Sequence, residues 1–246
     1  MASRRIDPGA LAIAALITLA CGCAPAMPMM LGGRTTPQGR VDLGLGGAVR
    51  IPTGDLVPRE MPVGAEELLA FAEPGGIVPV AWARWGFLRS WDAGLFVSGT
   101  TARLELIGGT SLSRFIRLIG GIAPYGGYAI SETRQGVGGG EGWRVGGIAP
   151  LAIALDLGGL FEAWLGARVG FEHAEGMVGA ESMRTAGNLT AFRAGAFLGL
   201  AVGLRRVHVV AELAADYEHW RGALGGVPIE RQGLALTPGF ALRLRF

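Results

Sequence analysis

The chain ends in the stretch TPGFALRLRF, residues 237–246, in which two kinds of side chain alternate. One set is mostly large and apolar: Pro238, Phe240, Leu242, Leu244 and Phe246. The other set is small or charged: Thr237, Gly239, Ala241, Arg243 and Arg245. A period of two predicts a β-strand with one apolar and one polar face. Since the apolar face continues to the final residue, either a protein core or lipid must cover it.

The same alternation recurs along the chain in blocks of about ten residues. The blocks predict strands at 40–51, 80–87, 91–99, 102–107, 115–125, 143–156, 160–172, 191–204, 207–218 and 237–246. Glycine, with 43 of 246 residues, is spread throughout and disfavours helices. Beyond the first 20 residues no uncharged apolar run approaches the length of a transmembrane helix. The sequence therefore predicts an all-β chain.

Composition narrows the class of protein. Charged residues make up 17% of the chain, below the value of about 25% that is usual for soluble domains. The net charge is +2, and all 22 basic residues are arginine. The arginines form no cluster of the kind that binds nucleic acid, so we expect no nucleic-acid partner.

The predicted connections alternate in length. Short turns are expected near 88–90, 110–113, 156–159 and 204–206, and longer loops near 52–76, 126–142, 173–190 and 219–231. Only the connection near 99–101 breaks the long set. Outer-membrane barrels have short periplasmic turns and longer outer loops. Within the first long loop, residues 64–76 carry an acidic start, helix formers and a Pro-Gly stop, which predict a short helix.

The final strand resembles the carboxy-terminal assembly signal of bacterial outer-membrane β-barrel proteins, with Phe240, Leu242, Leu244 and Phe246 in the signal positions. The run at 83–95 also resembles a hairpin of such barrels. The resemblance implies a porin-like or small outer-membrane barrel, surrounded by outer-membrane lipid and inserted by the barrel-assembly machinery. We predict a closed antiparallel transmembrane β-barrel of about ten strands, within a range of roughly eight to twelve, whose lumen connects periplasm and exterior.

The polar faces of the strands are predicted to line that lumen. The candidate lumen-lining residues are Arg84, Arg103, Glu105, Arg117, Arg144, Glu162, Arg168, Arg193, Glu212, Asp216 and Arg243. Both charge signs occur, so arginine–carboxylate pairs can fill and stiffen a narrow interior. The function expected is therefore structural or that of a narrow pore, in which an arginine-rich constriction would select small solutes.

The amino terminus is predicted to direct export. Residues 1–20 form a signal peptide that resembles those of bacterial lipoproteins, with Cys21 as the acylated residue. Acylation of Cys23 and an ordinary secretory signal remain alternatives. Residues 21–39 are interpreted as a periplasmic linker and residues 40–246 as the barrel. Both cysteines precede the barrel, so no internal disulfide is expected there.

Two other functions remain open. Asp216, Glu218 and His219 lie together in sequence near a predicted outer strand end, and they could form an acid–base site of a rim-active enzyme on lipid or peptide. No serine-nucleophile motif or metal-ligand spacing accompanies them, so we expect no enzyme, cofactor or metal. The second alternative is a lipid-tethered, soluble, lipocalin-like barrel, in which the apolar residues would face inward.

Overall fold

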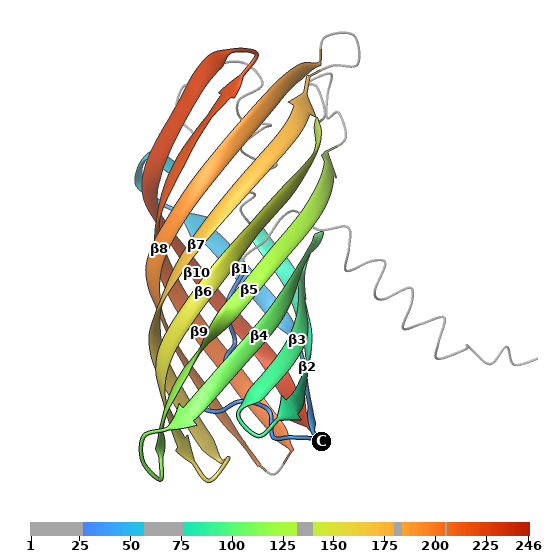
Figure 1. Cartoon of the computed structure of the whole chain (residues 1–246). Coiled ribbons are helices and arrows are strands. Elements are labelled where there is room, and N and C mark those ends of the chain that lie inside the picture. The colour runs from blue at the N-terminus through green and yellow to red at the C-terminus, as the bar shows by residue number, and fades with distance from the viewer. Residues whose placement is uncertain (1–26, 57–75, 132–139, 180–183, 205) are drawn as a thin grey trace, which may run out of the picture.

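The computed structural model describes residues 27–56, 76–131, 140–179, 184–204 and 206–246. They form a closed antiparallel barrel of ten strands, joined in the order β1-β10-β9-β8-β7-β6-β5-β4-β3-β2 (Figure 1). The elements are β1 (Val41–Pro52), the 3-10 helix η1 (Gly54–Leu56), β2 (Gly76–Leu88), β3 (Trp91–Ser98), β4 (Thr101–Ser111), β5 (Ile116–Ser131), β6 (Gly140–Leu157), β7 (Phe161–Val178), β8 (Thr185–Leu204), β9 (Val207–Leu224) and β10 (Val227–Arg245). The predicted fold class and all ten predicted strands are confirmed.

Strand β1 closes the barrel because it pairs with both β2 and β10. Leu43, for example, lies opposite Ala83 on one side and Leu244 on the other. Over the height that all ten strands share, closure leaves no unpaired sheet edge, which a strand in hydrocarbon cannot tolerate. Within the described residues, no helix has the length and apolarity needed to cross a membrane.

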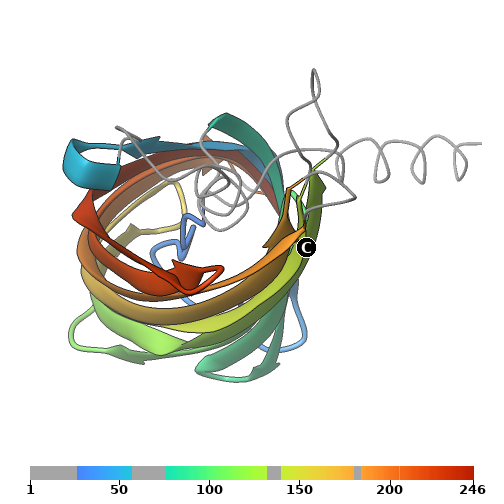
Figure 2. The ribbon, with the colours of Figure 1, turned by 90° about the horizontal axis from the view of Figure 1, so that it is seen from above.

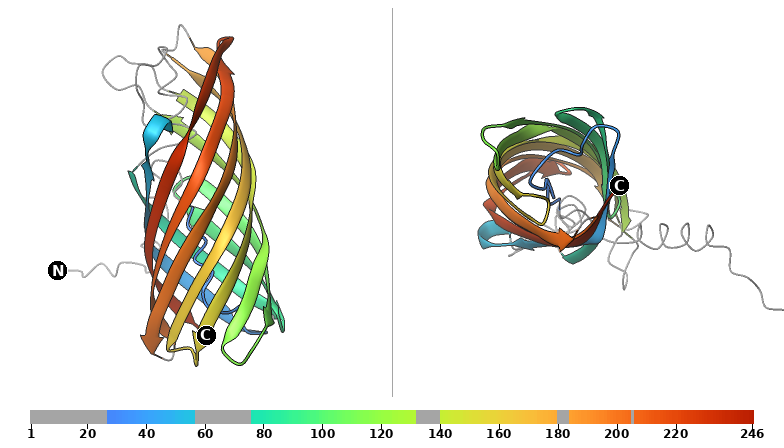
Figure 3. Two further views of the ribbon diagram at one scale, coloured as in Figure 1. Left: turned by 90° about the vertical axis from the view of Figure 1, so that its left-hand side faces the viewer. Right: turned by 90° about the horizontal axis from the view of Figure 1, so that it is seen from below.

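The two ends of the barrel differ. The carboxy terminus lies at one end, here called the C-terminal mouth, together with the turns after β2, β4, β6 and β8 (Figures 1 and 3). At the opposite mouth the strands end at unequal heights, because β3 has 8 residues and β8 has 20. The wall formed by the longer strands therefore rises well above β3 and β4.

Two of the predicted long loops are largely strand. Instead of a loop at 219–231, β9 and β10 continue to Gly225 and Gly226, whose backbones both adopt positive φ in a tight turn. The loop predicted at 173–190 shortens to residues 179–184. The loop at 126–142 is likewise shorter, since β5 reaches Ser131 and β6 begins at Gly140. The helix predicted at 64–76 falls almost entirely outside the described residues.

Apolar side chains face outward in a continuous band. On β7 the outward positions from Phe161 to Phe171 include Leu165, which is 63% exposed. The outward positions of β9 from Val207 to Tyr217 belong to the same band. Each run is 11 residues long, which matches the roughly 9–11 residues that a tilted strand needs to cross hydrocarbon. The outside of the barrel therefore has the height and chemistry of a lipid-facing surface.

This orientation is the reverse of that required by the soluble lipocalin-like alternative. On β7 the apolar Val169 is exposed, whereas its neighbour Arg168 is buried inside. Burying arginine while exposing valine would be unfavourable in water. The arrangement is favourable when lipid surrounds the barrel.

Inward-facing glycines make room for large side chains inside. A Cβ atom at Gly44 would lie 2.1 Å from the indole ring of Trp82, and one at Gly199 would lie 2.2 Å from that of Trp164. Both tryptophans are almost completely buried. Glycine at these positions therefore allows a ten-stranded wall to enclose bulky aromatic side chains.

Candidate functional site: the occupied lumen

Residues 27–36 lie inside the barrel rather than in a periplasmic linker. Figure 2 shows this stretch, in blue, within the ring of strands. Met29 and Met30 are completely buried, and Met27 and Leu31 nearly so. The interpretation of residues 21–39 as a linker is therefore wrong for this part of the chain, which we call the lumen segment. Pro37, Gln38 and Gly39 are exposed at the C-terminal mouth, where Gln38 pairs with Gly86.

Carboxylates of the barrel wall accept hydrogen bonds from the backbone of the lumen segment. The Met29 and Met30 N–H groups donate to the two oxygens of Glu212 on β9, the second at 2.8 Å. Farther along, the Gly33 N–H donates to Glu162 on β7 at 2.8 Å. These bonds replace the water that an extended segment would otherwise need for its N–H groups.

A third carboxylate, on β3, continues this pattern toward the C-terminal mouth. Thr36 donates its backbone N–H to Asp92 at 2.6 Å. Because each such bond has an ionised acceptor, it is stronger than a neutral backbone hydrogen bond. Carboxylates on three strands, β3, β7 and β9, thus accept hydrogen bonds from backbone N–H groups of the lumen segment.

Arginines of the wall donate to the carbonyl groups of the same segment. Arg84 on β2 donates to the carbonyls of Met30 at 2.6 Å and Met29 at 2.8 Å. Arg103 on β4 donates to Pro28 at 2.9 Å. Arg168 on β7 donates to Met27 at 2.8 Å. The wall therefore binds both kinds of backbone group in the lumen segment: carboxylates accept from its N–H groups, and arginines donate to its carbonyls.

The backbone of the lumen segment turns where the wall carboxylates and arginines bind it. Met30 has a φ of 48°, and Gly32 has a φ of 80°. A left-handed conformation is uncommon for a residue other than glycine and persists where the surroundings determine it. At Met30 those surroundings are Glu212, which accepts its N–H, and Arg84, which binds its carbonyl.

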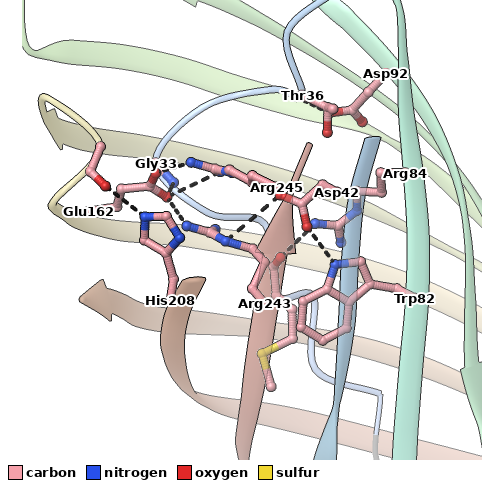
Figure 4. Close-up of polar contacts among 12 residues, drawn as sticks. Gly33, Thr36, Asp42, Trp82, Arg84, Asp92, Glu162, His208, Arg243 and Arg245 are labelled. Atoms are coloured by element: carbon pink, nitrogen blue, oxygen red, sulfur yellow. Dashed lines mark hydrogen bonds and ion pairs between the residues drawn. The ribbon is translucent and has the colours of Figure 1, made fainter. Parts of the chain in front are cut away.

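An ionic network closes the lumen near the C-terminal mouth (Figure 4). Glu162 pairs with Arg245 and, at 2.8 Å, with Arg243. Asp42 pairs with Arg245 at 2.9 Å and accepts a hydrogen bond from the Trp82 indole at 3.1 Å. These charges are buried, so their pairing is required rather than incidental.

Two further ionic groups lie deeper in the lumen. Glu105 is held between Arg84 and Arg103, each at 2.6 Å. Arg168 pairs with Asp216. The same arginines that bind the carbonyls of the lumen segment are therefore fixed by wall carboxylates.

Toward the opposite mouth, a last network contains no residue of the lumen segment. Glu218 pairs with Arg50 at 2.6 Å and with Arg193 at 3.3 Å. Arg193 also pairs with Glu172, which accepts a hydrogen bond from the Tyr125 hydroxyl at 2.6 Å. Cross-links of this kind join strands on different sides of the barrel and stiffen it.

Little space remains among these groups. A cavity of about 30 Å³ lies between the end of the lumen segment and the charged walls. Its lining includes Met27, Arg168, Arg193, Asp216 and Glu218. A cavity of that volume has room for a few water molecules at most. Around residues 27–36, side chains and backbone thus occupy most of the space between the walls.

Ten of the predicted lumen-lining residues lie in this interior or at its edge, and most take part in the contacts above. Arg144 is buried on the inward face of β6. Arg117 differs, because it is only half-buried near the C-terminal mouth and makes no ion pair with the described residues. The signal-position residues Phe240, Leu242 and Phe246 are exposed on the outer wall, while Leu244 is half-buried there. Cys21 and the signal peptide lie outside the described residues.

The residues suggested for a rim enzyme do not come together. Asp216 and Glu218 point into the barrel and are bound by arginines, whereas His219 faces outward. Consecutive residues of a strand point to opposite faces, so Glu218 and His219 cannot share a site. Among the described residues, no group of three or more histidine, cysteine or acidic side chains is placed to hold a metal.

His219 instead belongs to a polar belt above the apolar band. It contacts Glu230 at 2.9 Å, and Arg221 contacts the same carboxylate at 3.0 Å. The hydrogen bond from His219, followed by that from Arg221, lowers the pKa of Glu230 below its usual value. On β7 the first two outward residues beyond Phe171 are likewise polar, namely His173 and Glu175, and Met177 follows them. The change from apolar to polar outward side chains marks the edge of the lipid-facing surface on the side of the opposite mouth.

The residues of the lumen segment were not predicted as part of the site. The sequence signal for them is weak, because bonds made by the backbone impose no periodic pattern of side chains. Two features of residues 27–36 agree with a buried path: methionines at 27, 29 and 30, and no acidic residue. Methionine is common where an irregular gap must be filled.

No protein-family model and no curated protein sequence matches this chain. Three solved structures align with most of this chain. Neisserial surface protein A (NspA) is 13% identical, with a TM-score of 0.36, covering 84% of this chain and 96% of that chain. Ail, the attachment invasion locus protein of Yersinia pestis, is 13% identical, with a TM-score of 0.32, covering 85% and 99%. The CymD monoaromatic hydrocarbon channel is 7% identical, with a TM-score of 0.25, covering 85% and 89%. At these identities the likeness concerns the fold alone.

Proposed function

We propose that this chain is a structural outer-membrane β-barrel that its own lumen segment closes to solutes. The C-terminal mouth would face the periplasm, because it carries the short turns and both ends of the strand sequence. The opposite mouth would face the exterior. Export by the signal at 1–20, acylation at Cys21 and insertion by the barrel-assembly machinery belong to the same proposal.

The observation that carries this proposal is the binding of residues 27–36 across the lumen. Three wall carboxylates and three wall arginines bind its backbone. Hydrogen bonds to charged groups contribute about 1.5–3 kcal/mol each. A segment held by several such bonds stays in place, so passage of a solute would require breaking them together.

The narrow-pore alternative is less well supported. An arginine-rich constriction needs arginines that are free to meet a passing solute. Here Arg84, Arg103 and Arg168 are occupied by the lumen segment and by carboxylates. The cavity of about 30 Å³ beside Met27 has room for only a few water molecules.

Single-channel recording in planar bilayers tests the closure directly. The full chain is expected to give no conductance, and a variant lacking residues 27–36 is expected to conduct ions. A variant lacking the same number of residues between positions 57 and 75 serves as the control. Stable channels in the full chain, unchanged by removal of the lumen segment, would contradict the proposal.

Cysteine protection provides a second readout that does not depend on conductance. With Cys21 and Cys23 replaced by alanine, Met29→Cys and Gln38→Cys are compared in the folded barrel. The buried position is expected to react with a polyethylene-glycol maleimide only after unfolding, whereas Gln38→Cys reacts at once. Equal rates would place the segment outside the lumen.

A further inference from the structure

A basic hollow of about 310 Å³ lies at the C-terminal mouth, beside the point where the chain enters the lumen. Its lining residues are Arg34, Thr36, Pro37, Arg40, Val41, Arg206, Arg245 and Phe246. Four of these eight residues are arginines and none is acidic. The C-terminal carboxylate is the single negative group of the lining residues, so the hollow has a net positive charge.

The arginines of this hollow differ in how far the protein neutralises them. Arg245 is occupied by Asp42 and Glu162. Arg34 has only a 3.6 Å contact with Asp156, and its Nε atom is buried without a hydrogen-bond partner. Arg40 and Arg206 are exposed and form no ion pair with the described residues. Two to three cations are therefore available to a ligand.

Backbone contacts fix the position of these arginines relative to the last strand. The Arg245 N–H donates to the Arg206 carbonyl at 2.8 Å, and the Phe246 N–H donates to the Val41 carbonyl at 2.9 Å. Arg40 donates its own N–H to Pro37 at 2.9 Å. The hollow is thus built on the pairing of β1, β9 and β10 rather than on a free loop.

The hollow borders the apolar outer band. Phe246, a lining residue, is 49% exposed. Leu204 and Val207, which flank the turn that contains Arg206, are 74% and 46% exposed and face outward. A ligand that fits this border has an anionic head for the arginines and an apolar body for the wall.

We propose that this hollow binds the phosphate of an anionic phospholipid headgroup in the inner leaflet of the membrane. The proposal rests on the proposed function, since it takes the C-terminal mouth to be periplasmic. Arginine suits phosphate because its planar guanidinium can donate two parallel hydrogen bonds. A free phosphate would use the same cations but would gain nothing from Phe246 and Leu204, so the lipid is favoured.

Native mass spectrometry of the full chain in detergent micelles can measure this binding. Dioleoyl-phosphatidylglycerol is titrated against dioleoyl-phosphatidylcholine, which has no net charge. The test variant is Arg40→Gln with Arg206→Gln. The control is Arg89→Gln with Arg114→Gln, which removes the same charge from exposed turns at the same mouth. Inorganic phosphate is titrated separately by calorimetry.

The expected result is one phosphatidylglycerol bound in preference to phosphatidylcholine. Its Kd should rise by about tenfold or more in the test variant, because each arginine near an anionic lipid contributes a severalfold effect. The control should change it little. No preference for phosphatidylglycerol, or equal weakening in both variants, would overturn the proposal. Phosphate binding that depends on Arg40 and Arg206, without a lipid preference, would assign the hollow to free phosphate instead.

The same variants separate this proposal from the closure of the lumen. Among the described residues, the side chains of Arg40 and Arg206 form no hydrogen bond or ion pair with residues 27–36, although they line the same hollow as Arg34 and Thr36. Protection of Met29→Cys should therefore persist in the test variant. If the unmodified barrel shows no lipid preference but still protects Met29→Cys, only the lipid site is overturned, whereas lost protection in the unmodified barrel overturns the proposed function.

Discussion

Glu162 on β7 and Arg243 on β10 meet at 2.8 Å inside the barrel, although 81 residues separate them and two strands lie between theirs in the wall. Arg245 binds the same carboxylate, and the Gly33 N–H of the lumen segment donates to it. One side chain thus joins the wall, the closing strand and the lumen segment.

Replacement of this carboxylate should strongly destabilise the barrel. Glu162→Gln leaves Arg243 and Arg245 with Asp42 as their remaining partner, and removing one member of a buried ion pair costs about 3–5 kcal/mol. The free energy of unfolding in urea, measured in detergent micelles, should fall by that order. In the control, Glu141→Gln breaks an exposed pair with Arg184 and should cost about 1 kcal/mol or less. Similar losses in both variants would contradict the cross-lumen role.

Glu212 should control how firmly the lumen segment is held. Glu212→Gln weakens two charge-assisted bonds to the Met29 and Met30 N–H groups. We expect maleimide labelling of Met29→Cys to accelerate by roughly tenfold or more, since one such bond contributes about 1.5–3 kcal/mol. The matched variant Glu175→Gln, on the outer wall, should leave the labelling rate unchanged. Unchanged labelling in both variants would show that Glu212 does not hold the segment.

The height of the apolar band predicts where a charge is tolerated. Leu165→Arg places a cation in the middle of the band and should cost about 2–4 kcal/mol. Ala186→Arg places the same side chain above the band, opposite Met177 and two residues from Asn188, and should cost about 1 kcal/mol or less. Urea unfolding of both variants in lipid vesicles measures the difference. Equal costs would mean that lipid does not contact Leu165.

Phe246 should affect assembly more than stability. Phe246→Ala and Phe171→Ala each remove one exposed outward aromatic ring, 49% and 55% exposed. The two variants should therefore lose similar amounts of lipid contact. If the terminal strand is the assembly signal, only Phe246→Ala should lower the amount of heat-modifiable barrel in the outer-membrane fraction. Equal amounts of heat-modifiable barrel in the two variants would contradict an assembly role for Phe246.

The pKa of Glu230 offers a test of the polar belt. His219→Gln removes the largest cause of its lowered pKa, so the value should move up toward that of an unperturbed glutamate. Because the folded-state pKa is the lower one, this contact stabilises the barrel above the unfolded pKa and is lost as the pH falls through the folded value. Carbon NMR of the labelled carboxyl group would follow the titration. Arg184→Gln, at another position near the mouth opposite the C-terminal one, should leave the pKa of Glu230 unchanged.

Sequence alone located the strands because a lipid-facing wall requires opposite chemistry on alternate residues. Arg168 and Val169 show this clearly, one buried among charges and the other exposed. Where the wall rises beyond the band, the outward face becomes polar at His219, Arg221 and Glu230. The alternation then disappears although the strand continues, which is why a loop was predicted at 219–231.

The lumen segment could not be predicted in the same way. Its partners, Glu212 and Glu162, are 129–183 residues away in sequence and bind its backbone. Nothing in the side chains of residues 27–36 encodes such contacts. The suggestion of an acid–base site at Asp216 and His219 failed for a simpler reason, because strand geometry sends the two to opposite faces.

The position of the lumen segment within the chain has a consequence for the order of folding. The wall residues that bind its backbone belong to β2, β3, β4, β7 and β9. The seam between β1 and β10 joins residues about two hundred positions apart, such as Asp42 and Arg245. An open, curved sheet of β2–β9 already presents those groups, so the segment can be captured while the sheet is still open. Seam formation would then be the last event and would trap the segment, which makes release from the finished barrel far slower than its capture.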